Sequence, residues 1–316
     1  MKKQLWLIGA GYMAKEYIKV LNALNASFLV VGRGQMRVKE LKDEYNIDAI
    51  DGGLLHYLTS NPVIPEYAII AVSCEELYIT TLNLIKAGVK NILVEKPGGL
   101  SSAEIKELDS ISGITGTNLV IAYNRRFYKS VEFLRNMIKE DGGIRSVNFE
   151  FTEWIHTIDI NKFPLQVLQK FLIANSSHVI DTVFHLAGRP VKLNCSVYGN
   201  EVSWHPSGSI FSGSGITDRN VVFSYASNWG APGRWAIEIL TSKRRYYLKP
   251  LERLAIQEKG SVVINEYNGD YSIDIDYKPG LYNLVNAFIC KNSKLLCGIN
   301  EHFQNFDLYE QIGNYS

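Results

Sequence analysis

Short apolar runs alternate with segments of helical periodicity over the first 124 residues. The apolar runs are the predicted strands: LWLIG (5–9), FLVVG (28–32), YAIIAVS (67–73), NILVE (91–95) and LVIAY (119–123). Several of them are apolar throughout, which is typical of parallel strands that are covered on both faces. Residues 12–25 and 75–88 have helical periodicity, and Gly88 is placed to end the second helix. This alternation predicts an α/β domain with a doubly wound parallel sheet.

The pattern changes from about residue 144 onward. A strand-like segment at 146–154 and a helix near 176–187 precede runs of β character at 191–199, 220–229, 234–242, 244–250 and 261–267. These runs predict an α+β domain with a mostly antiparallel sheet. Residues 281–290 and 300–313 are predicted helices, which can pack back onto the first domain. We place a boundary near residue 124, which gives domains of residues 1–124 and 125–316.

Charge and cysteine content narrow the range of functions. Lys and Arg number 33 against 32 Asp and Glu, and this balance argues against a protein that binds nucleic acid or a membrane surface. The four cysteines form no CxxC pair, so neither a disulfide framework nor a zinc site is expected, and a reducing cytoplasm is the natural setting. The apolar run at the N-terminus is interpreted as a buried strand, and no other segment is long and apolar enough to predict a membrane span.

The first predicted strand runs directly into Gly9-x-Gly11-x-x-Ala14, and a predicted helix follows. The first glycine permits a tight turn, the second lets the backbone approach a pyrophosphate, and the small third residue allows close packing of helix on strand. The helix N-terminus supplies amide donors and a positive dipole to the phosphates. At the first strand of a strand–helix chain, this motif predicts a dinucleotide site.

The second predicted strand ends in Gly32-Arg33-Gly34 and not in an acidic residue. An acid at this place binds the ribose 2′-hydroxyl, whereas an arginine can receive a 2′-phosphate. The sequence therefore favours NADP slightly over NAD, and a solvated loop arginine is the alternative interpretation of Arg33.

Several motifs occur in order over nearly the whole chain: the Gly9–Ala14 turn, AVS (71–73), IKAGVKNILVEKP (85–97), AYNRRF (122–127) and SSHVID (176–181). In these motifs the chain resembles the Gfo/Idh/MocA family, the glucose–fructose oxidoreductase and inositol dehydrogenase group. The resemblance implies a Rossmann domain and an open-sheet domain that carries the substrate site and an oligomer interface. It implies NAD(P)-dependent oxidation or reduction at a carbon of a sugar, cyclitol or nucleotide-linked sugar, in a homodimer or homotetramer.

The resemblance also implies roles for individual residues. The residues implied to bind the cofactor are Gly9, Gly11, Tyr12, Met13, Arg33, Ser73, Glu95 and Asn124. Lys96 is implied to lie near the nicotinamide, and Arg125 to border the cofactor and the substrate. One departure follows the fourth strand, where SCEELY (73–78) stands in place of the proline–asparagine pair and histidine that the family often has.

A dehydrogenase takes its hydride chemistry from the cofactor, and the protein must move a proton. Lys96 can act as a base if burial and nearby positive charge lower its pKa, or it can polarise the substrate oxygen while charged. His178 is the second candidate. If Asn175 or Ser176 caps the helix, His178 falls in its first turn, where the dipole favours a neutral imidazole. We therefore predict Lys96 and His178 as the catalytic residues.

The helix near 176–187 allows other interpretations. Its polar positions, spaced i, i+3 and i+7, are His178, Asp181 and His185. They are typical of the polar edge of a capped helix as well as of an active site, and a metal is not expected because one helix rarely supplies all its ligands. Upstream, the family commonly has an aspartate four residues before the histidine, and here that position is Ala174.

Substrate contacts are predicted in the second domain, at Arg125, Trp154, Asn175, Asp181 and Arg234. Aromatic side chains stack on sugar faces, an arginine can bind a phosphate or carboxylate in bidentate fashion, and an asparagine can hydrogen-bond a hydroxyl. Two alternatives remain beside the sugar oxidoreductase. One is a catalytically silent dinucleotide-binding sensor or scaffold, which Ala174 motivates, and the other is a reductase of a non-sugar substrate that resembles biliverdin reductase.

Overall fold

The structure is a computed structural model that describes residues 5–315. The chain forms two compact units. Unit 1 comprises Met1–Tyr123 and Leu281–Gln304, and unit 2 comprises Asn124–Gly280 and Asn305–Ser316. The chain thus leaves unit 1 close to the predicted boundary, but unit 2 is not continuous in sequence, because residues 281–304 belong to unit 1.

Unit 1 is built on a seven-stranded sheet whose strands have the order β15-β6-β5-β4-β1-β2-β3. The strands are β1 Leu5–Ile8, β2 Phe28–Val31, β3 Ala49–Ile50, β4 Tyr67–Ile70, β5 Asn91–Val94, β6 Asn118–Ile121 and β15 Cys297–Gly298. All pairs are parallel except β15 with β6. The central strands β1, β4 and β5 are buried along their whole length, as the continuous apolar runs predicted.

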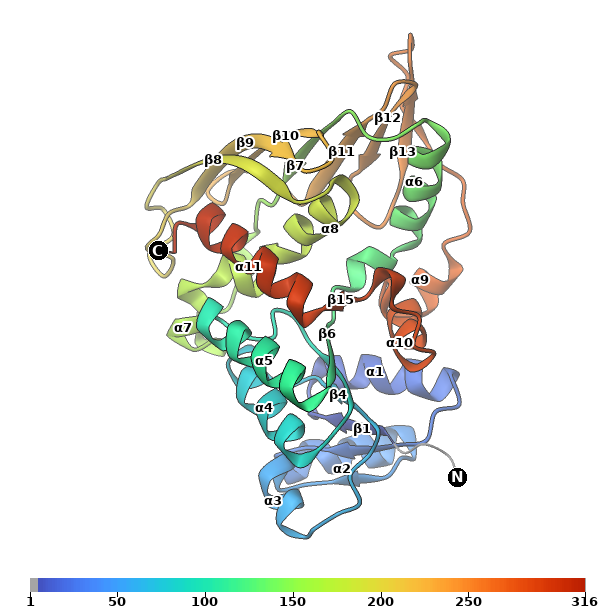
Figure 1. Cartoon of the computed structure of the whole chain (residues 1–316), viewed down its shortest axis with the longest axis vertical. Helices are drawn as coiled ribbons and strands as arrows, with labels where there is room; N and C mark the ends of the chain where they lie inside the picture. The colour runs from blue at the N-terminus through green and yellow to red at the C-terminus, as the bar shows by residue number, and fades with distance from the viewer. Residues whose placement is uncertain (1–4, 316) are drawn as a thin grey trace. The chain divides into compact units, whose positions relative to one another are not determined.

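The helices of unit 1 connect and cover these strands. They are α1 Tyr12–Ala23, α2 Gln35–Tyr45, α3 Gly53–Thr59, α4 Leu77–Ala87, α5 Ser102–Thr115 and α10 Leu281–Ile289. Helices α4 and α5 lie side by side (Figure 1), and α1 packs against α10. Gly88 ends α4 in the left-handed conformation with φ +99°, as predicted. Helix α11, Ile299–Gly313, begins in unit 1 and ends in unit 2.

Unit 2 is built on an eight-stranded sheet of order β14-β13-β12-β11-β7-β10-β9-β8. The strands are β7 Ser146–Glu150, β8 Pro190–Tyr198, β9 Ile210–Thr217, β10 Val222–Asn228, β11 Ala236–Leu240, β12 Arg244–Leu248, β13 Ala255–Glu258 and β14 Asn265–Glu266. Only β7 and β10 pair in parallel. The helices are α6 Lys129–Glu140, α7 Leu165–Gln169, α8 Ser177–Ala187 and α9 Ser272–Asp276.

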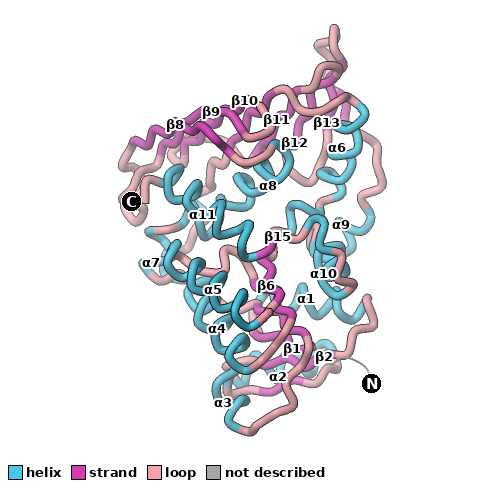
Figure 2. The backbone as a smooth tube through the Cα atoms, viewed as in Figure 1, coloured by secondary structure: helices cyan, strands magenta, loops and turns pink. Residues whose placement is uncertain are grey.

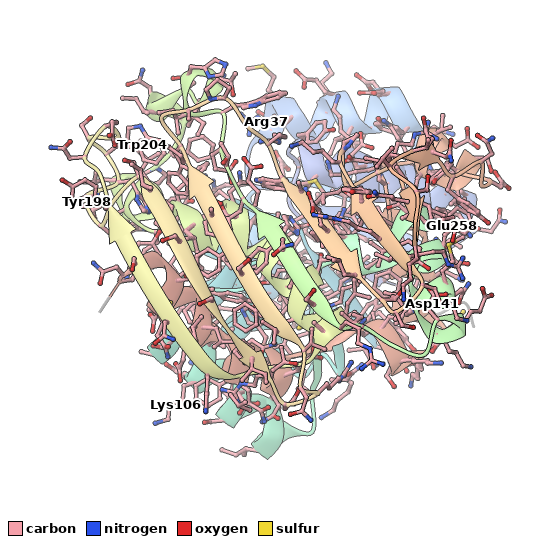
Figure 3. The ribbon with its side chains drawn as sticks, turned by 90° about the horizontal axis from the view of Figure 1, so that it is seen from above. Arg37, Lys106, Asp141, Tyr198, Trp204 and Glu258 are labelled. Atoms are coloured by element: carbon pink, nitrogen blue, oxygen red, sulfur yellow. The ribbon has the colours of Figure 1, made fainter. Side chains whose placement is uncertain are left out.

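One face of this sheet is covered and the other is open. Helix α8 packs under β7 and β11, where Figure 2 shows it against the sheet. Aromatic side chains such as Phe149, Phe151 and Tyr225 fill the space between α8 and the strands. Figure 3 looks onto the opposite face, with Tyr198 on the edge strand β8.

The predicted fold class, a doubly wound parallel sheet followed by an open and mostly antiparallel one, is confirmed. The predicted strand at 261–267 is wrong over 261–264, where Val262 is 91% exposed, and only Asn265–Glu266 pairs. Strand β9 was not predicted, because its IFSGSGIT sequence lacks apolar alternation. Its Gly213 is required because a Cβ would lie 2.4 Å from the hydroxyl oxygen of Tyr225.

Candidate functional site

Four strands of unit 1 end in register at the carboxyl edge of the sheet. Ile8 of β1 pairs with Val31 of β2 and with Ile70 of β4, and Ile70 pairs with Val94 of β5. The segments that follow these strands therefore start side by side. They carry the residues predicted to bind a dinucleotide, at 9–13, 33, 73 and 95. This edge is where doubly wound sheets bind their ligands.

The turn after β1 leaves no room for a side chain at its first glycine. Gly9 has φ +124°, and a Cβ there would lie 2.3 Å from the carbonyl oxygen of Ala71. A Cβ at Gly11 would meet no atom within 4 Å, so the backbone at the start of α1 borders open space. Gly11 is the N-cap residue and has no side chain to cap the helix, which leaves the first-turn amides to a phosphate. Ala14 is fully buried against the sheet.

Of the next four cofactor candidates, three are exposed and one is half-buried. Tyr12 is largely exposed in the first turn of α1, and Met13 follows it half-buried. The side chain of Arg33 is 85% exposed, and its Nη1 lies 4.0 Å from Oε1 of Glu76. An exposed pair at this distance contributes little, so the guanidinium can turn toward a phosphate at small cost. Ser73 is exposed just before α4.

Glu95 and Lys96 follow β5 and are half-buried. The Tyr17 hydroxyl donates to Oε1 of Glu95 over 2.8 Å, and burial followed by the Glu95 charge raises the pKa of Tyr17, which keeps the phenol protonated. The Lys96–Pro97 peptide bond is cis. Nε2 of buried His302 donates to the Pro97 carbonyl over 2.8 Å. Sequence reasoning missed His302, because it reaches this loop from α11 and no local motif marks it.

Unit 2 begins with the turn that carries the next two predicted residues. Asn124 is buried, and its side-chain amide donates to the carbonyl of Pro279 over 2.9 Å. Nη1 of Arg125 donates back to Oδ1 of Asn124 over 3.0 Å. The Arg125 guanidinium lies 4.8 Å from the ring centroid of Trp235, within cation–π range. The turn therefore fixes the direction of the Arg125 side chain.

His178 lies in α8, and the predicted cap before it is wrong. A π turn at Leu172–Ser176 leads directly into α8, and Ser176 has helical φ −70° and ψ −18°. Neither Asn175 nor Ser176 therefore starts the helix, and the expected effect of a helix N-terminus on His178 is lost. The His178 side chain is 5% exposed, and its ring centroid lies 6.1 Å from that of Trp235. Asn175 is half-buried in the π turn.

Asp181, one turn further along α8, meets an arginine that sequence reasoning missed. Nε and Nη2 of Arg126 donate to its two carboxylate oxygens over 2.8 and 2.5 Å. Both side chains are almost fully buried, with 1% and 0% exposure. This bidentate pair holds α8 to the turn that contains Asn124 and Arg125. A contact between Asp181 and substrate stays a prediction.

A second buried carboxylate, Glu153, lies just beyond β7 and is 3% exposed. Its Oε1 accepts from the Ser176 hydroxyl over 2.5 Å and from the Trp235 indole N–H over 3.1 Å, and its Oε2 lies 3.4 Å from Nη1 of Arg234. The Arg234 guanidinium lies 4.7 Å from the ring centroid of Trp154 and 4.8 Å from that of Trp235. Unit 2 thus places Arg125 and Arg234 over Trp235, beside His178, and Arg234 also lies over Trp154.

Both polar and apolar positions of α8 are buried, so the interpretation as a solvated helix edge does not hold for His178 and Asp181. Among residues 5–315 no group of three or more His, Cys, Asp or Glu side chains is arranged to hold a metal ion. Burial raises the pKa of Cys74 to about 12, so its thiol stays protonated. Within the same residues, no helix has the length and apolar character that a membrane crossing requires.

Comparison with protein families supports a dinucleotide-binding role for unit 1. Residues 3–122 match the Gfo/Idh/MocA model, described as "Oxidoreductase family, NAD-binding Rossmann fold". A curated relative, trans-1,2-dihydrobenzene-1,2-diol dehydrogenase of Mus musculus, is 29% identical over 151 residues, which are 46% of this chain and 44% of that protein. The chain thus spans about half the length of the curated relatives it matches.

Solved structures resemble the chain over nearly its whole length. UDP-N-acetylglucosamine 3-dehydrogenase of Acidithiobacillus ferrooxidans has a TM-score of 0.74 and 15% identity, covering 99% of this chain and 97% of that one. A super-repressor mutant of Gal80p from Saccharomyces cerevisiae has a TM-score of 0.80 and 14% identity, covering 99% and 95%. At these identities the likeness establishes the fold of both units and nothing finer.

Proposed function

We propose that this chain, whose residues 3–122 belong to the Gfo/Idh/MocA oxidoreductase family, is an NAD(P)-dependent dehydrogenase of a sugar or nucleotide-linked sugar. The observation that carries the proposal is the turn after β1. Gly9 cannot hold a Cβ, whereas Gly11 borders open space at an uncapped helix start, as a pyrophosphate requires. The family match supplies the cofactor class, and unit 2 supplies side chains suited to a sugar.

The cofactor would be held by Gly9, Gly11 and the first turn of α1 at the pyrophosphate, with Arg33 at the ribose and Glu95 and Lys96 toward the nicotinamide. When bound, it accepts or supplies the hydride. The chain's own task is the proton of the substrate hydroxyl. Lys96 accepts that proton during oxidation and returns it during reduction, or polarises the oxygen as a cation, and His178 is the second proton-handling residue.

The side chains around Trp235 support the proposed substrate class. The indole of Trp154 is 48% exposed and offers an aromatic face to a sugar ring. Arg125 and Arg234 bring two positive charges to this cluster, and Glu153 brings one negative charge. The excess positive charge favours an anionic substituent, such as the phosphates of a nucleotide-linked sugar.

The decisive experiment measures NADPH and NADH oxidation with a panel of keto-sugars and nucleotide-linked keto-sugars. Lys96→Ala is expected to lower kcat at least about 100-fold, the usual contribution of a positioned acid or base, while either dinucleotide still raises Tm. Lys90→Ala is the matched control, because Lys90 is exposed just before the same strand. Wild-type turnover that survives in Lys96→Ala would contradict the assigned role.

The cofactor preference has its own test. If Arg33 receives a 2′-phosphate, Arg33→Ser raises the Kd for NADPH about ten-fold and leaves the Kd for NADH unchanged. Calorimetric titration of both dinucleotides measures the two constants. An equal change in both would remove Arg33 from the ribose site and leave the preference for NADP without support.

A homodimer or homotetramer in the cytoplasm remains part of the proposal. Large apolar side chains are exposed on the unit 2 sheet, where Val191 and Tyr198 of β8 and Val222 of β10 are 63%, 79% and 55% exposed. A second subunit that covered this sheet would remove the apolar surface of these side chains from water. Light scattering coupled to gel filtration gives the subunit number, and a monomer at micromolar concentration would contradict this part.

The second candidate function is a dinucleotide-binding sensor or scaffold without turnover. It is favoured by Ala174, which leaves the helical segment before His178 without a carboxylate. Proteins of one fold can differ in whether they catalyse a reaction. Binding of NADPH or NADH without turnover of any member of the panel would favour this candidate, and no thermal shift with either dinucleotide would contradict both.

A further inference from the structure

The buried carboxylate of Glu153 has no role in the proposed proton transfer by Lys96 and His178. Burying a carboxylate is unfavourable unless hydrogen-bond donors or positive charges compensate it. Here three donors do so, from Ser176 in the π turn and from Arg234 and Trp235 in the loop before β11. A glutamate in water would need none of these partners, so the surrounding side chains are arranged to hold a buried carboxylate at this position.

The two carboxylate oxygens have different partners. Oε1 receives the hydroxyl of Ser176 and the indole N–H of Trp235, and Oε2 receives Arg234. Because the indole N–H is directional, its bond to Oε1 limits the rotation of the Trp235 ring. Because Oε2 faces Arg234, the carboxylate also fixes where the guanidinium lies over that ring.

Trp235 in turn contacts the other groups of the cluster. Its ring centroid lies 6.1 Å from that of His178, and Arg125 lies over it at 4.8 Å. A shift of the indole would therefore displace both arginines relative to the histidine. The orientation of this cluster depends on one carboxylate that is itself too buried to contact much solvent.

We propose that Glu153 is a positioning residue, which orients Trp235 and Arg234 beside His178 so that unit 2 binds the substrate in one defined geometry. This inference rests on the proposed function for the identity of the substrate, but its structural part can be tested without turnover. Glu153 acts through its partners and does not handle the proton.

The first variant separates the two oxygens. Glu153→Gln keeps the size of the side chain and one oxygen that can accept from Ser176 and Trp235. It turns the other oxygen into an NH₂ group, which repels Arg234 instead of binding it. Glu153→Leu removes both functions, and Glu258→Gln, at an exposed glutamate on β13 of the same unit, is the control for a neutralised glutamate.

The first measurement uses fluorine NMR of protein labelled with 5-fluorotryptophan. The chain has 5 tryptophans, and the resonance of Trp235 is assigned by its loss in Trp235→Phe. We expect the Trp235 resonance to move in Glu153→Leu, to move less in Glu153→Gln, and to stay in place in Glu258→Gln. An unmoved Trp235 resonance in both Glu153 variants would overturn the proposal.

The second measurement is kinetic, with the substrate that the panel identifies. Glu153→Gln is expected to raise the KM for the sugar about ten-fold, with kcat changed less than about three-fold and the KM for the cofactor unchanged. A purely structural role would instead alter cofactor binding and shift every tryptophan resonance, and either result overturns the inference. If the wild type turns over no sugar, the proposed function fails, and the fluorine spectra alone decide the role of Glu153.

Discussion

The two units hold their candidate site residues in place in different ways. Unit 1 uses the backbone: a glycine without room for a Cβ, a helix start without a side-chain cap, and loops that begin together because parallel strands end in register. Unit 2 uses side chains from separate segments, held by buried ion pairs such as Arg126 with Asp181. A backbone site depends on a few small residues, whereas a side-chain site depends on compensated charges.

This difference determines which property each unit should lose when a site residue is substituted. A substitution in the unit 1 turn should block the ligand or the turn itself. A substitution in unit 2 should leave a buried charge without its partner. Such a change should lower the free energy of unfolding more than it lowers ligand affinity.

The largest effect is expected from Asp181→Ala. It leaves the Arg126 guanidinium buried without its bidentate partner, and the free energy of unfolding should fall by about 3–5 kcal/mol. Urea unfolding followed by circular dichroism measures the loss. Asp159→Ala, at an exposed surface pair with Lys162, is the control and should change little.

The double variant Arg126→Met/Asp181→Leu sharpens the same test. Replacing both charges with apolar side chains of similar size removes the unpaired charge, so it should recover much of the stability lost in Asp181→Ala. If the double variant is as unstable as the single one, the cost comes from packing and not from the charge, and the contrast between the units weakens.

The next effect is expected in unit 1, from Gly9→Ala. The added Cβ would lie 2.3 Å from the Ala71 oxygen at a φ that alanine rarely adopts, so we expect a loss of about 2–4 kcal/mol and of dinucleotide binding. Gly11→Ala should keep the stability, because its Cβ meets no atom, yet weaken dinucleotide binding. Denaturant midpoints and dinucleotide titrations separate the two variants. Equal losses of stability would refute the interpretation that only Gly9 lacks room for a Cβ.

The contrast also explains which parts of the site were predictable. The turn from Gly9 to Ala14 and the strand ends of unit 1 follow local rules of spacing and periodicity, so the sequence alone indicated them. Glu153, Arg126 and His302 were not predicted, because each acts through a hydrogen bond to a partner far along the chain, which no local sequence pattern indicates. The predicted cap before His178 failed for a related reason: a π turn continues the helix through Asn-Ser-Ser, although these residues favour caps locally.

A third prediction concerns acid stability, which should be governed by unit 2. Burial lowers the pKa of His205 to about 4 and that of His185 to about 3, against about 6.5 in an unfolded chain. The native state therefore binds fewer protons than the unfolded state below pH 6.5. The stability that these neutral histidines contribute is complete above about pH 6.5 and is lost as pH falls toward 4 and 3, by at most about 1.4 kcal/mol per pH unit for each.

Urea midpoints at pH 7.5 and pH 5 measure this loss. His205→Gln and His185→Gln should each reduce the difference between the two midpoints, because a glutamine binds no proton in this range. Carboxylates also contribute to acid unfolding, so the comparison with each variant is what assigns the effect. A difference that is the same in the wild type and in both variants would exclude these histidines.

The smallest effect is expected from Tyr315→Phe, which tests how unit 2 holds the π turn before His178. The Tyr315 hydroxyl accepts from the backbone N–H of Leu172 over 3.1 Å and lies 2.5 Å from Nε2 of His205, whose Nδ1 donates to the Gly208 carbonyl. Removing the hydroxyl leaves one buried donor and one buried acceptor without that partner, which should cost about 1–2 kcal/mol in unfolding free energy. Tyr198→Phe, at a side chain that is 79% exposed on β8, should cost almost nothing. If Tyr315→Phe also leaves the unfolding free energy unchanged, the π turn is held by packing alone. Side-chain hydrogen bonds would then contribute less to unit 2 than we infer from its comparison with unit 1.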